Sequence, residues 1–416
     1  MSRLIAAVRE LPQSLRRITT GKVYRPEIDG LRFFAISIVI IGHIMQRVER
    51  SQANVAPPSD IEHALLQIVR PGLGVLLFFA VSGFIIGSQF LRGPAKSPNW
   101  HYLRAYFLRR VTRIEPPYFI LLVGTYALLS AINYVPQNVN HFNMGPESLS
   151  LSLFASLAYS HGWLFGTFPR LFPPGWSLEI EVQFYILAPL FFFLFFKITD
   201  PISRLRLGIA IEICACLLAP LVNAATPGRH LLGFTLGEFF QYFWLGIMLA
   251  DVNLNSKELV QRYPKAWAST GAWLGLILMI GAGAFLEDGM IHGGTYAYLF
   301  LNLLTVVAIL LLFGGALQGP TFRALCSRPW VSLLGGACYS LYLTHLQIIH
   351  ATAPLLHAAS FPPLLESALS LAVQIPLIFG GGLIFYALLE RPFMVPEWPT
   401  LIYRKYFGRH SSVSQA

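Results

Sequence analysis

The sequence predicts an all-α, polytopic integral membrane protein with about ten transmembrane helices and both termini in the cytoplasm. Of its 416 residues, 55% are hydrophobic and only 12% are charged, whereas a soluble domain is usually about 25% charged. The mean hydropathy is +0.58. Apolar stretches of bilayer length recur along the chain, and Lys and Arg residues collect in alternate loops. A soluble globular domain is therefore excluded as the main body of the protein.

Each predicted helix is an apolar run close to the roughly 20 residues that cross a bilayer core. The ten runs, in chain order, are 31–47, 72–91, 114–132, 177–196, 208–223, 234–250, 267–286, 296–314, 331–352 and 366–389. A further apolar run at 149–168 is ambiguous, because a crossing there would move every later loop to the other side of the membrane.

The distribution of Lys and Arg resolves this ambiguity. With ten spans and a cytoplasmic N-terminus, all but five of the 30 Lys and Arg residues fall inside, as the positive-inside rule expects. The five outside are Arg47, Arg50, Arg70, Arg170 and Arg229. An eleventh crossing at 149–168 would carry later basic loops outward. We therefore expect 133–176 to lie outside, partly as an interfacial or re-entrant element.

The chain divides into a basic cytoplasmic N-terminal segment, 1–30, a membrane domain, 31–393, and a cytoplasmic C-terminal tail, 394–416. No cleavage-site pattern precedes the first apolar run, so no removable signal peptide is expected. The basic segment fits either an amphipathic helix on an anionic membrane surface or a flexible charged tail. The net charge of +10 follows from the loop pattern, so no nucleic acid partner is implied, and the four Cys residues lack metal-ligand spacing.

The first predicted span carries two ionisable residues, Arg32 at its entrance and His43 deep inside. Eleven positions on a helix correspond to about 1,100° of turn and a rise of about 16 Å, so the two side chains share a face. Burial favours a neutral imidazole, which is the form that a general base requires. An ionisable residue inside the membrane indicates a functional site. The alternative is that His43 merely hydrogen-bonds a neighbouring helix.

Several blocks of the sequence carry a family resemblance. They are "YRPEIDGLRFFAISIVIIGH" (24–43), "FFAVSGFIIG" (78–87), "LRRVTRIEPPYF" (108–119), "PPGWSLEIEVQFYILAPL" (173–190), "CYSLYLTHLQII" (338–349) and "LLERPF" (388–393). These blocks and their order along the chain resemble the membrane-bound acyltransferase 3 family. The resemblance is to its stand-alone form, which lacks a C-terminal esterase-like domain. The resemblance implies that 31–393 is an acyltransferase membrane domain of about ten helices. Family members O-acylate, most often O-acetylate, cell-surface saccharides from a cytoplasmic acyl-coenzyme A (acyl-CoA).

Three arginines, Arg109, Arg110 and Arg113, stand at the cytoplasmic start of the third predicted span. The planar arginine fork suits the phosphate oxygens that coenzyme A presents. Arg110 and Arg113 are three residues apart and share a helix face, and they match the paired arginines of the family motif. We interpret the three as binding the acyl donor. Ordinary positive-inside flanking with snorkelling side chains is the alternative.

The fourth predicted span begins with a second candidate group. Glu181 matches the family glutamate, and Tyr185 lies one turn further on the same face. Glu181 is expected to orient His43 or to hold acceptor hydroxyls. Trp176 is a candidate for stacking on a sugar, although an interfacial belt Trp fits equally well. Glu179 points elsewhere and is expected to be a solvated carboxylate at the helix entrance.

Two other motif positions are interpreted as structural. Ser82 and Gly83 in the second span are expected to let helices approach closely. His345 matches another recurrent family histidine, and we expect it to make a structural hydrogen bond.

Together, these features predict a multi-pass enzyme of a bacterial inner membrane that contacts membrane lipid. It would transfer acetyl or another acyl group from acyl-CoA to a saccharide hydroxyl, with His43 as general base and with no permanently bound cofactor or metal. Polysaccharide biosynthesis proteins are candidate partners. The rival predictions are a polytopic transporter of a glycan or acyl precursor and a non-catalytic partner of a polysaccharide synthase. No broken-helix symmetry typical of transporters is evident.

Overall fold

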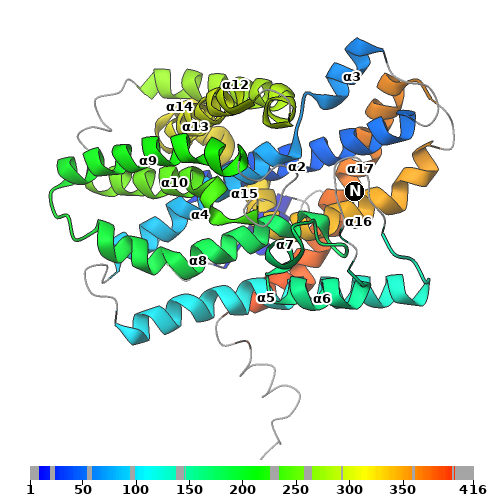
Figure 1. Ribbon diagram of the computed structural model, residues 1–416, viewed down its shortest axis with the longest axis horizontal. Coiled ribbons are helices and arrows are strands. Elements are labelled where there is room, and N and C mark those ends of the chain that lie inside the picture. The colour runs from blue at the N-terminus through cyan, green and yellow to red at the C-terminus, as the bar shows by residue number, and fades with distance from the viewer. Residues whose placement is uncertain are drawn as a thin grey trace, which may run out of the picture.

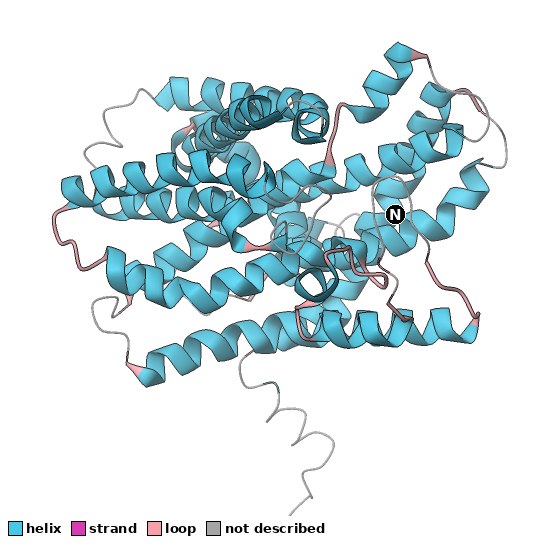
Figure 2. Ribbon diagram, viewed as in Figure 1, coloured by secondary structure: helices cyan, strands magenta, loops and turns pink. Residues whose placement is uncertain are grey.

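The computed structural model describes most of the chain, and all regular structure in the described residues is helical (Figures 1 and 2). The described residues are 9–18, 24–53, 59–93, 99–136, 145, 147–224, 234–256, 265–291, 294–357, 361–395 and 398. The predicted tail, 394–416, falls almost wholly outside these residues, as do 1–8 and 19–23 of the N-terminal segment.

Within the described residues, seven helical segments are long and apolar enough to cross a membrane, so the chain is a polytopic membrane protein. They are Pro26–Gln52, Leu65–Arg92, Trp100–Ala131, Pro173–Phe195, Pro201–Val222, Gly294–Gln318 and Pro363–Met394. The helices that form most of each span are α2 (Pro26–Ala53), α3 (Asp60–Gln67) with α4 (Pro71–Arg92), α5 (Trp100–Ala131), α8 (Trp176–Phe195), α9 (Pro201–Ala224), α13 (Gly294–Gln318) and α17 (Pro363–Phe385).

The other three predicted spans are also helical, but they differ in composition or continuity. The run at 234–250 forms α10 (Leu236–Asn255), which carries buried acidic residues, and 267–286 lies within α12 (Lys265–Ile291). The run at 331–352 is divided into α15 (Pro329–Gly336) and α16 (Cys338–His357). Two glycines at the end of α15 explain this break, because glycine is a poor helix former.

Local sequence signals explain where several helices begin. Asn99 caps α5 by accepting a hydrogen bond from the backbone N–H of Tyr102 at 2.9 Å, as an N-cap side chain should. Ser148 caps α6 (Leu149–Leu157) in the same way. Pro71 and Pro329 stand in the first turns of α4 and α15, where a missing N–H costs little.

Helix α2 lies at the centre of the bundle (Figure 1). It packs against α4, α15, α16 and α17, and almost three quarters of its apolar span is buried. Because α2 is continuous from residue 26 to residue 53, it carries both Arg32 and His43 into the protein interior. The prediction that these two residues share one helix is confirmed.

The ambiguous run at 149–168 forms no spanning helix in the structure. It forms α6 (Leu149–Leu157) and α7 (His161–Phe165), which are separated by a turn. Positive φ angles occur next to each end of α7, at Tyr159 and Gly166. A nine-residue helix is about 13 Å long, which is too short for a bilayer core.

Glycines allow an unusually close contact between α4 and α10. A Cβ atom built on Gly83 would lie 2.0 Å from the carbonyl oxygen of Phe243, and one on Gly246 would lie 2.0 Å from that of Ala80. Small residues at a helix interface let the backbones approach in this way. The interpretation of Gly83 as a packing residue is therefore confirmed.

We expect Gly83→Ala to destabilise the protein by about 1–3 kcal/mol or more, because the added methyl group forces α4 away from α10. The measurement is the thermal unfolding midpoint of the detergent-solubilised protein. Gly124→Ala on α5 is the matched control, since nothing lies within 4 Å of the added Cβ there. Equal midpoints for the two variants would contradict the close contact.

Candidate active site

A cavity of about 800 Å³ lies among α2, α4, α5 and α8, and arginines dominate its charged lining. Glu181 is the acidic side chain in that lining. The lining arginines are Arg17, Arg25, Arg32, Arg92, Arg109, Arg110 and Arg113. Such an excess of positive charge in a partly enclosed space favours a polyanionic ligand.

The structure brings together six of the eight residues that the sequence analysis selected. Those that line the cavity are Arg32, Arg109, Arg110, Arg113, Glu181 and Tyr185. His43 and Trp176 are outside the lining.

Arg110 is held in place by uncharged groups. Its guanidinium donates to the carbonyl oxygen of Tyr106 at 3.2 Å and to the side-chain oxygen of Gln89 at 3.0 Å. The same group lies 3.9 Å from the Tyr106 ring centroid and 5.2 Å from that of Tyr185. These contacts fix the direction of the fork without neutralising its charge.

Arg32 and Arg113 are each paired with a buried carboxylate. Arg32 donates to Asp29 at 2.9 Å, and the side chain of Asp29 is only 1% exposed. Arg113 lies 3.4 Å from Glu390, which also accepts from the backbone N–H and the hydroxyl of Ser340. The "LLERPF" block thus fastens the start of α16 to α5. Arg113 keeps less free charge than Arg110.

Arg17 reaches the cavity from the N-terminal segment, and the sequence analysis did not select it. Its guanidinium lies 3.7 Å from Oδ1 of Asp29, the same oxygen that Arg32 contacts. The segment is anchored because Arg391 donates to the carbonyl oxygen of Ser14 at 2.9 Å. No local signal in the sequence distinguishes Arg17 from the other basic residues of 1–30.

Glu181 faces α4 across the cavity. The hydroxyl of Ser82 donates a hydrogen bond to its carboxylate. Ser82 therefore does more than allow close packing, and the interpretation of this residue as a packing position was incomplete. Tyr185, one turn further along α8, accepts the hydroxyl of Tyr106 at its carbonyl oxygen, 3.0 Å away.

His43 is buried and contacts His345 of α16. The Nδ1 atom of His43 is 3.0 Å from the carbonyl oxygen of Val39 and 3.1 Å from Nε2 of His345. Nδ1 of His345 is 2.6 Å from the carbonyl oxygen of Tyr342. A carbonyl oxygen only accepts, so in the neutral rings both Nδ1 atoms carry the proton. This assignment leaves Nε2 of His43 as the unprotonated nitrogen of that ring.

His345 thus has a more specific contact than the sequence analysis expected. Its hydrogen bond to Tyr342 is the structural bond that we predicted. Its second nitrogen, however, accepts from His43, which sets the tautomer of the candidate base. The sequence separation of 302 residues explains why pattern analysis could not pair the two rings.

Tyr342 links the cavity wall to the two histidines. It lines the cavity, and its ring centroid is 5.8 Å from that of His345. Its hydroxyl is anchored at the start of α8 by Ser177, 2.8 Å away, and by the carbonyl oxygen of Pro174. Tyr342 and His345 therefore connect the cavity wall to His43.

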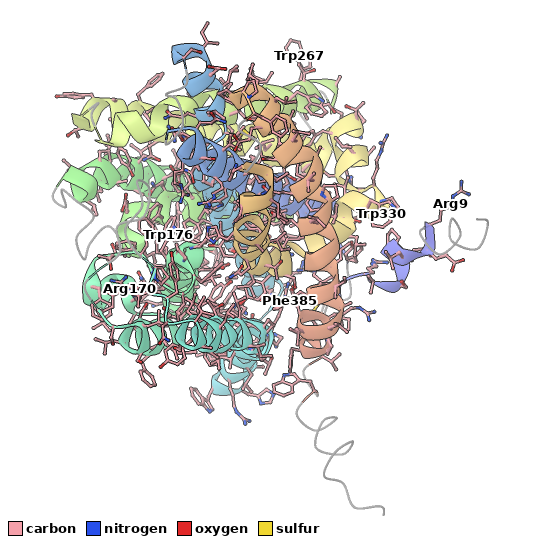
Figure 3. The ribbon with its side chains drawn as sticks, turned by 90° about the vertical axis from the view of Figure 1, so that its right-hand side faces the viewer. Arg9, Arg170, Trp176, Trp267, Trp330 and Phe385 are labelled. Carbon is pink, nitrogen blue, oxygen red and sulfur yellow. The ribbon has the colours of Figure 1, made fainter. Side chains whose placement is uncertain are left out.

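Trp176, which is labelled in Figure 3, belongs to a cluster of aromatic rings at the start of α8. Its nearest ring in that cluster is Phe239, with centroids 5.4 Å apart, and Phe79 and Phe168 lie at 6.4 and 6.5 Å. Phe79 lines the cavity, so Trp176 forms the layer behind that wall.

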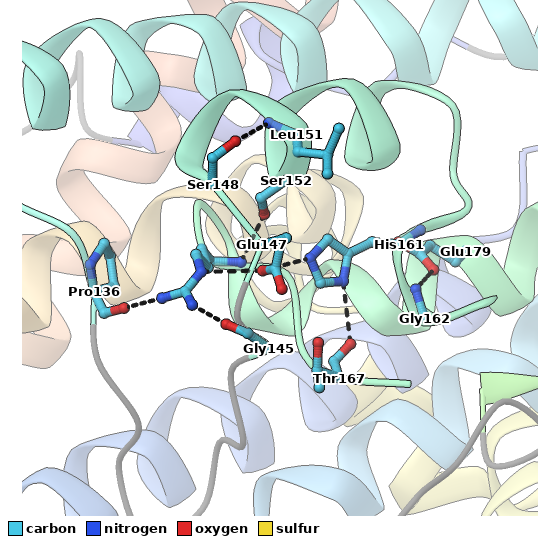
Figure 4. A network of polar contacts seen from close by, with 11 residues as sticks. Pro136, Gly145, Glu147, Ser148, Leu151, Ser152, His161, Gly162, Thr167 and Glu179 are labelled. Atoms are coloured by element: carbon cyan, nitrogen blue, oxygen red, sulfur yellow. Dashed lines mark hydrogen bonds and ion pairs between the residues drawn. The ribbon is translucent and has the colours of Figure 1, made fainter. Parts of the chain in front are cut away.

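A buried polar network ties down the segment between α5 and α8 (Figure 4). Glu147 accepts from Arg170 at 3.0 Å and lies 3.2 Å from Nε2 of His161. The remaining nitrogens of the Arg170 side chain donate to the carbonyl oxygens of Pro136 and Gly145. Burial lowers the pKa of His161, while Glu147 opposes that shift. Arg170 was interpreted only as a topological marker, and its structural role was missed.

Glu179 is not solvated, so the prediction for this residue was wrong. It is 0% exposed, and its two carboxylate oxygens accept the backbone N–H groups of His161 and Gly162 at 3.1 and 2.8 Å (Figure 4). The first turn of α7 has unpaired N–H groups, and a carboxylate satisfies them. Glu179 thereby joins α7 to α8.

We expect Arg170→Gln to destabilise the protein by about 3–5 kcal/mol, because Glu147 would lose its buried positive partner. Arg206→Gln, which removes an exposed arginine on α9, is the control and should change little. Thermal unfolding in detergent measures both. An unchanged midpoint for Arg170→Gln would show that the network contributes little to stability.

Comparisons with known proteins give a family match and several relatives. A family model described as "Acyltransferase domain" (Acyl_transf_3) matches residues 25–391. The chain is 23% identical over 352 residues to the peptidoglycan O-acetyltransferase OatA of Listeria monocytogenes, covering 81% of this chain and 51% of that protein. It is 26% identical over 349 residues to "Putative peptidoglycan O-acetyltransferase YrhL" of Bacillus subtilis, covering 80% and 49%.

The chain spans about half the length of these curated relatives. No solved structure matches it. The family match, by contrast, runs from the residue before α2 to Arg391, and it includes both histidines and all of the cavity lining except Arg17, Ile18 and Met394. The chain therefore belongs to the membrane-bound acyltransferase 3 family.

Proposed function

We propose that this protein transfers an acyl group, in the first instance acetyl, from cytoplasmic acyl-CoA to a hydroxyl of an extracytoplasmic or lipid-linked saccharide. The observation that carries the proposal is the arginine-lined cavity that leads toward the His43–His345 pair. The O-acetyltransferase names of the relatives support the acetyl group and a glycan acceptor.

The donor would bind with its phosphates among the arginines. Coenzyme A is a polyanion, and a cavity lined by seven arginines and one glutamate is electrostatically complementary to it. Among the described residues, no carboxylate forms an ion pair with Arg109 or Arg110, so these two are the first choice for phosphate contacts. From Arg32 to His43 the helix rises about 16 Å, a distance that a flexible pantetheine arm can cover.

The transfer step follows from the histidine geometry. The unprotonated Nε2 of His43 would accept the proton of the acceptor hydroxyl as the hydroxyl oxygen attacks the thioester carbonyl. The carbon–sulfur bond breaks, and the departing sulfur takes up that proton, which gives the acyl ester and free coenzyme A. His345 is a positioning residue in this scheme.

The remaining elements of the proposal concern the membrane. We place the protein in a bacterial inner membrane, with about ten spans and both termini in the cytoplasm. The arginine end of the cavity then faces cytoplasmic acyl-CoA, and the C-terminal end of α2 faces the acceptor. Polysaccharide biosynthesis proteins are the partners that would deliver such an acceptor. Glu181 would hold an acceptor hydroxyl or the donor arm, with Trp176 and Tyr185 around it.

The test uses membranes that contain the protein, acetyl-CoA labelled in the acetyl group, and the lipid-linked saccharides of the host. We expect label in the saccharide fraction together with an equal amount of free coenzyme A thiol. A transporter would release no thiol. A non-catalytic partner would leave both signals unchanged when His43 is replaced.

A further inference from the structure

We propose a second binding site at the C-terminal end of α2, which recognises an anionic group, carboxylate or phosphate, on the acceptor saccharide. Its central residues are Arg47 and Arg50, together with His350 of α16. The inference rests on the proposed function, because it names the chemical class of the acceptor that meets His43.

The helix geometry aligns this site with the candidate base. His43, Arg47 and Arg50 follow the spacing i, i+4 and i+7, so they lie on one face of α2. Arg50 is about 10 Å further along the helix axis than His43. Figure 3 looks onto the end of the bundle where this part of α2 lies beside α3 and α17.

Two like charges stand one helical turn apart here. Arg47 and Arg50 are three positions apart on α2, and His350 of α16 is close enough for both arginines to act on it electrostatically. The two arginines are half-buried, while His350 is exposed and therefore accessible to a ligand. The Nε atom of Arg47 is buried and meets no hydrogen-bond partner among the described residues. Repulsion between the two guanidinium groups falls when an anion binds between them.

Three carboxylates near the C-terminal end of α2 already have hydrogen-bond or ion-pair partners. Glu49, which attracts Arg50, accepts from Gln67 at 2.8 Å. Glu366 contacts Gln52 and His357. Glu62 closes the N-terminal cap of its own helix, α3, with Ser59.

The topology makes this collection of arginines unusual. With ten spans, five of the 30 Lys and Arg residues lie outside, and three of those five, Arg47, Arg50 and Arg70, belong to the adjoining ends of α2 and α4. The positive-inside rule disfavours basic residues on this side. Arginine also presents a fork that fits carboxylate and phosphate oxygens equally well. An anionic acceptor would account for the presence of these arginines beside His43.

The experiment measures glycan binding to the purified full-length protein in nanodiscs of zwitterionic lipid. The probes are trigalacturonic acid, maltotriose carrying one phosphate, and uncharged maltotriose. At low salt we expect a charged probe to bind at least about tenfold more tightly than maltotriose. The charged probe that binds more tightly shows whether the site prefers a carboxylate or a phosphate group.

Variants test whether Arg47 and Arg50 cause the preference for a charged probe. Arg47→Gln combined with Arg50→Gln should reduce binding of the charged probe to the level of maltotriose. Arg104→Gln combined with Arg206→Gln removes two exposed arginines elsewhere and should preserve the preference. A preference that survives the Arg47/Arg50 change would overturn the proposal.

Two further measurements keep the test decisive. Raising the salt from about 0.02 M to about 0.5 M should abolish the preference of the wild type without any mutation, because screening weakens exposed charge pairs. Equal binding of all three probes at low salt would refute the site directly. Coenzyme A binding is measured in parallel: its absence in the wild type would overturn the proposed donor, while the glycan result would still stand or fall independently.

Discussion

His43→Ala is expected to lower the rate of acyl transfer by about 10²–10⁴, the usual contribution of a general base, without weakening coenzyme A binding. The reason is that His43 lies beyond the wall of the arginine-lined cavity and contacts His345 instead. The loss should therefore appear in kcat, while KM for acetyl-CoA changes little. Label transfer from acetyl-CoA into the saccharide fraction measures the rate.

His101→Ala is the matched control, since it removes an exposed histidine from α5. His345→Gln provides an intermediate case. The amide can still hydrogen-bond to His43, so we expect partial activity with an altered pH profile, whereas His345→Ala should lose more. Full activity of His43→Ala at equal protein abundance would remove His43 from the mechanism.

Arg110→Gln is expected to weaken coenzyme A binding about 10- to 100-fold, which corresponds to about 1.5–3 kcal/mol for a hydrogen bond to a charged group. Arg110 is pre-oriented by Gln89 and by the two tyrosine rings. Its charge is therefore available for a phosphate at little entropic cost. Isothermal titration with coenzyme A measures the change in Kd, and the wild-type affinity should fall as salt rises.

Arg104→Gln on the same helix is the control, because Arg104 is exposed and outside the cavity lining. Arg113→Gln should have a smaller effect on Kd than Arg110→Gln, since Arg113 already pairs with Glu390. If Arg104→Gln and Arg110→Gln bound coenzyme A equally well, the cavity would not be the donor site.

The sequence was informative where one helix carried the whole signal. Apolar runs of bilayer length predicted helices that the structure contains, and the spacing of Arg32 and His43 predicted their common helix. Arg109, Arg110 and Arg113 of α5, which the sequence analysis assigned to donor binding, line one cavity. In each case the residues concerned belong to one helix, so the helical period was sufficient.

The sequence was uninformative where distant segments meet. His345 contacts His43 across 302 residues, and Arg17 reaches the cavity because the N-terminal segment is held by Arg391. Glu179 looked like a solvated carboxylate, yet it is buried and accepts two backbone N–H groups of α7. These contacts depend on how helices and short connecting segments pack, and periodicity within one segment carries no information about that.

The most direct test of the central claim is an experimental structure of the full-length protein with coenzyme A bound. We predict phosphate density beside Arg109 and Arg110, with the pantetheine arm extending past Arg32 toward Tyr342. Coenzyme A bound elsewhere, or with its thiol directed away from the His43–His345 pair, would contradict the proposed mechanism.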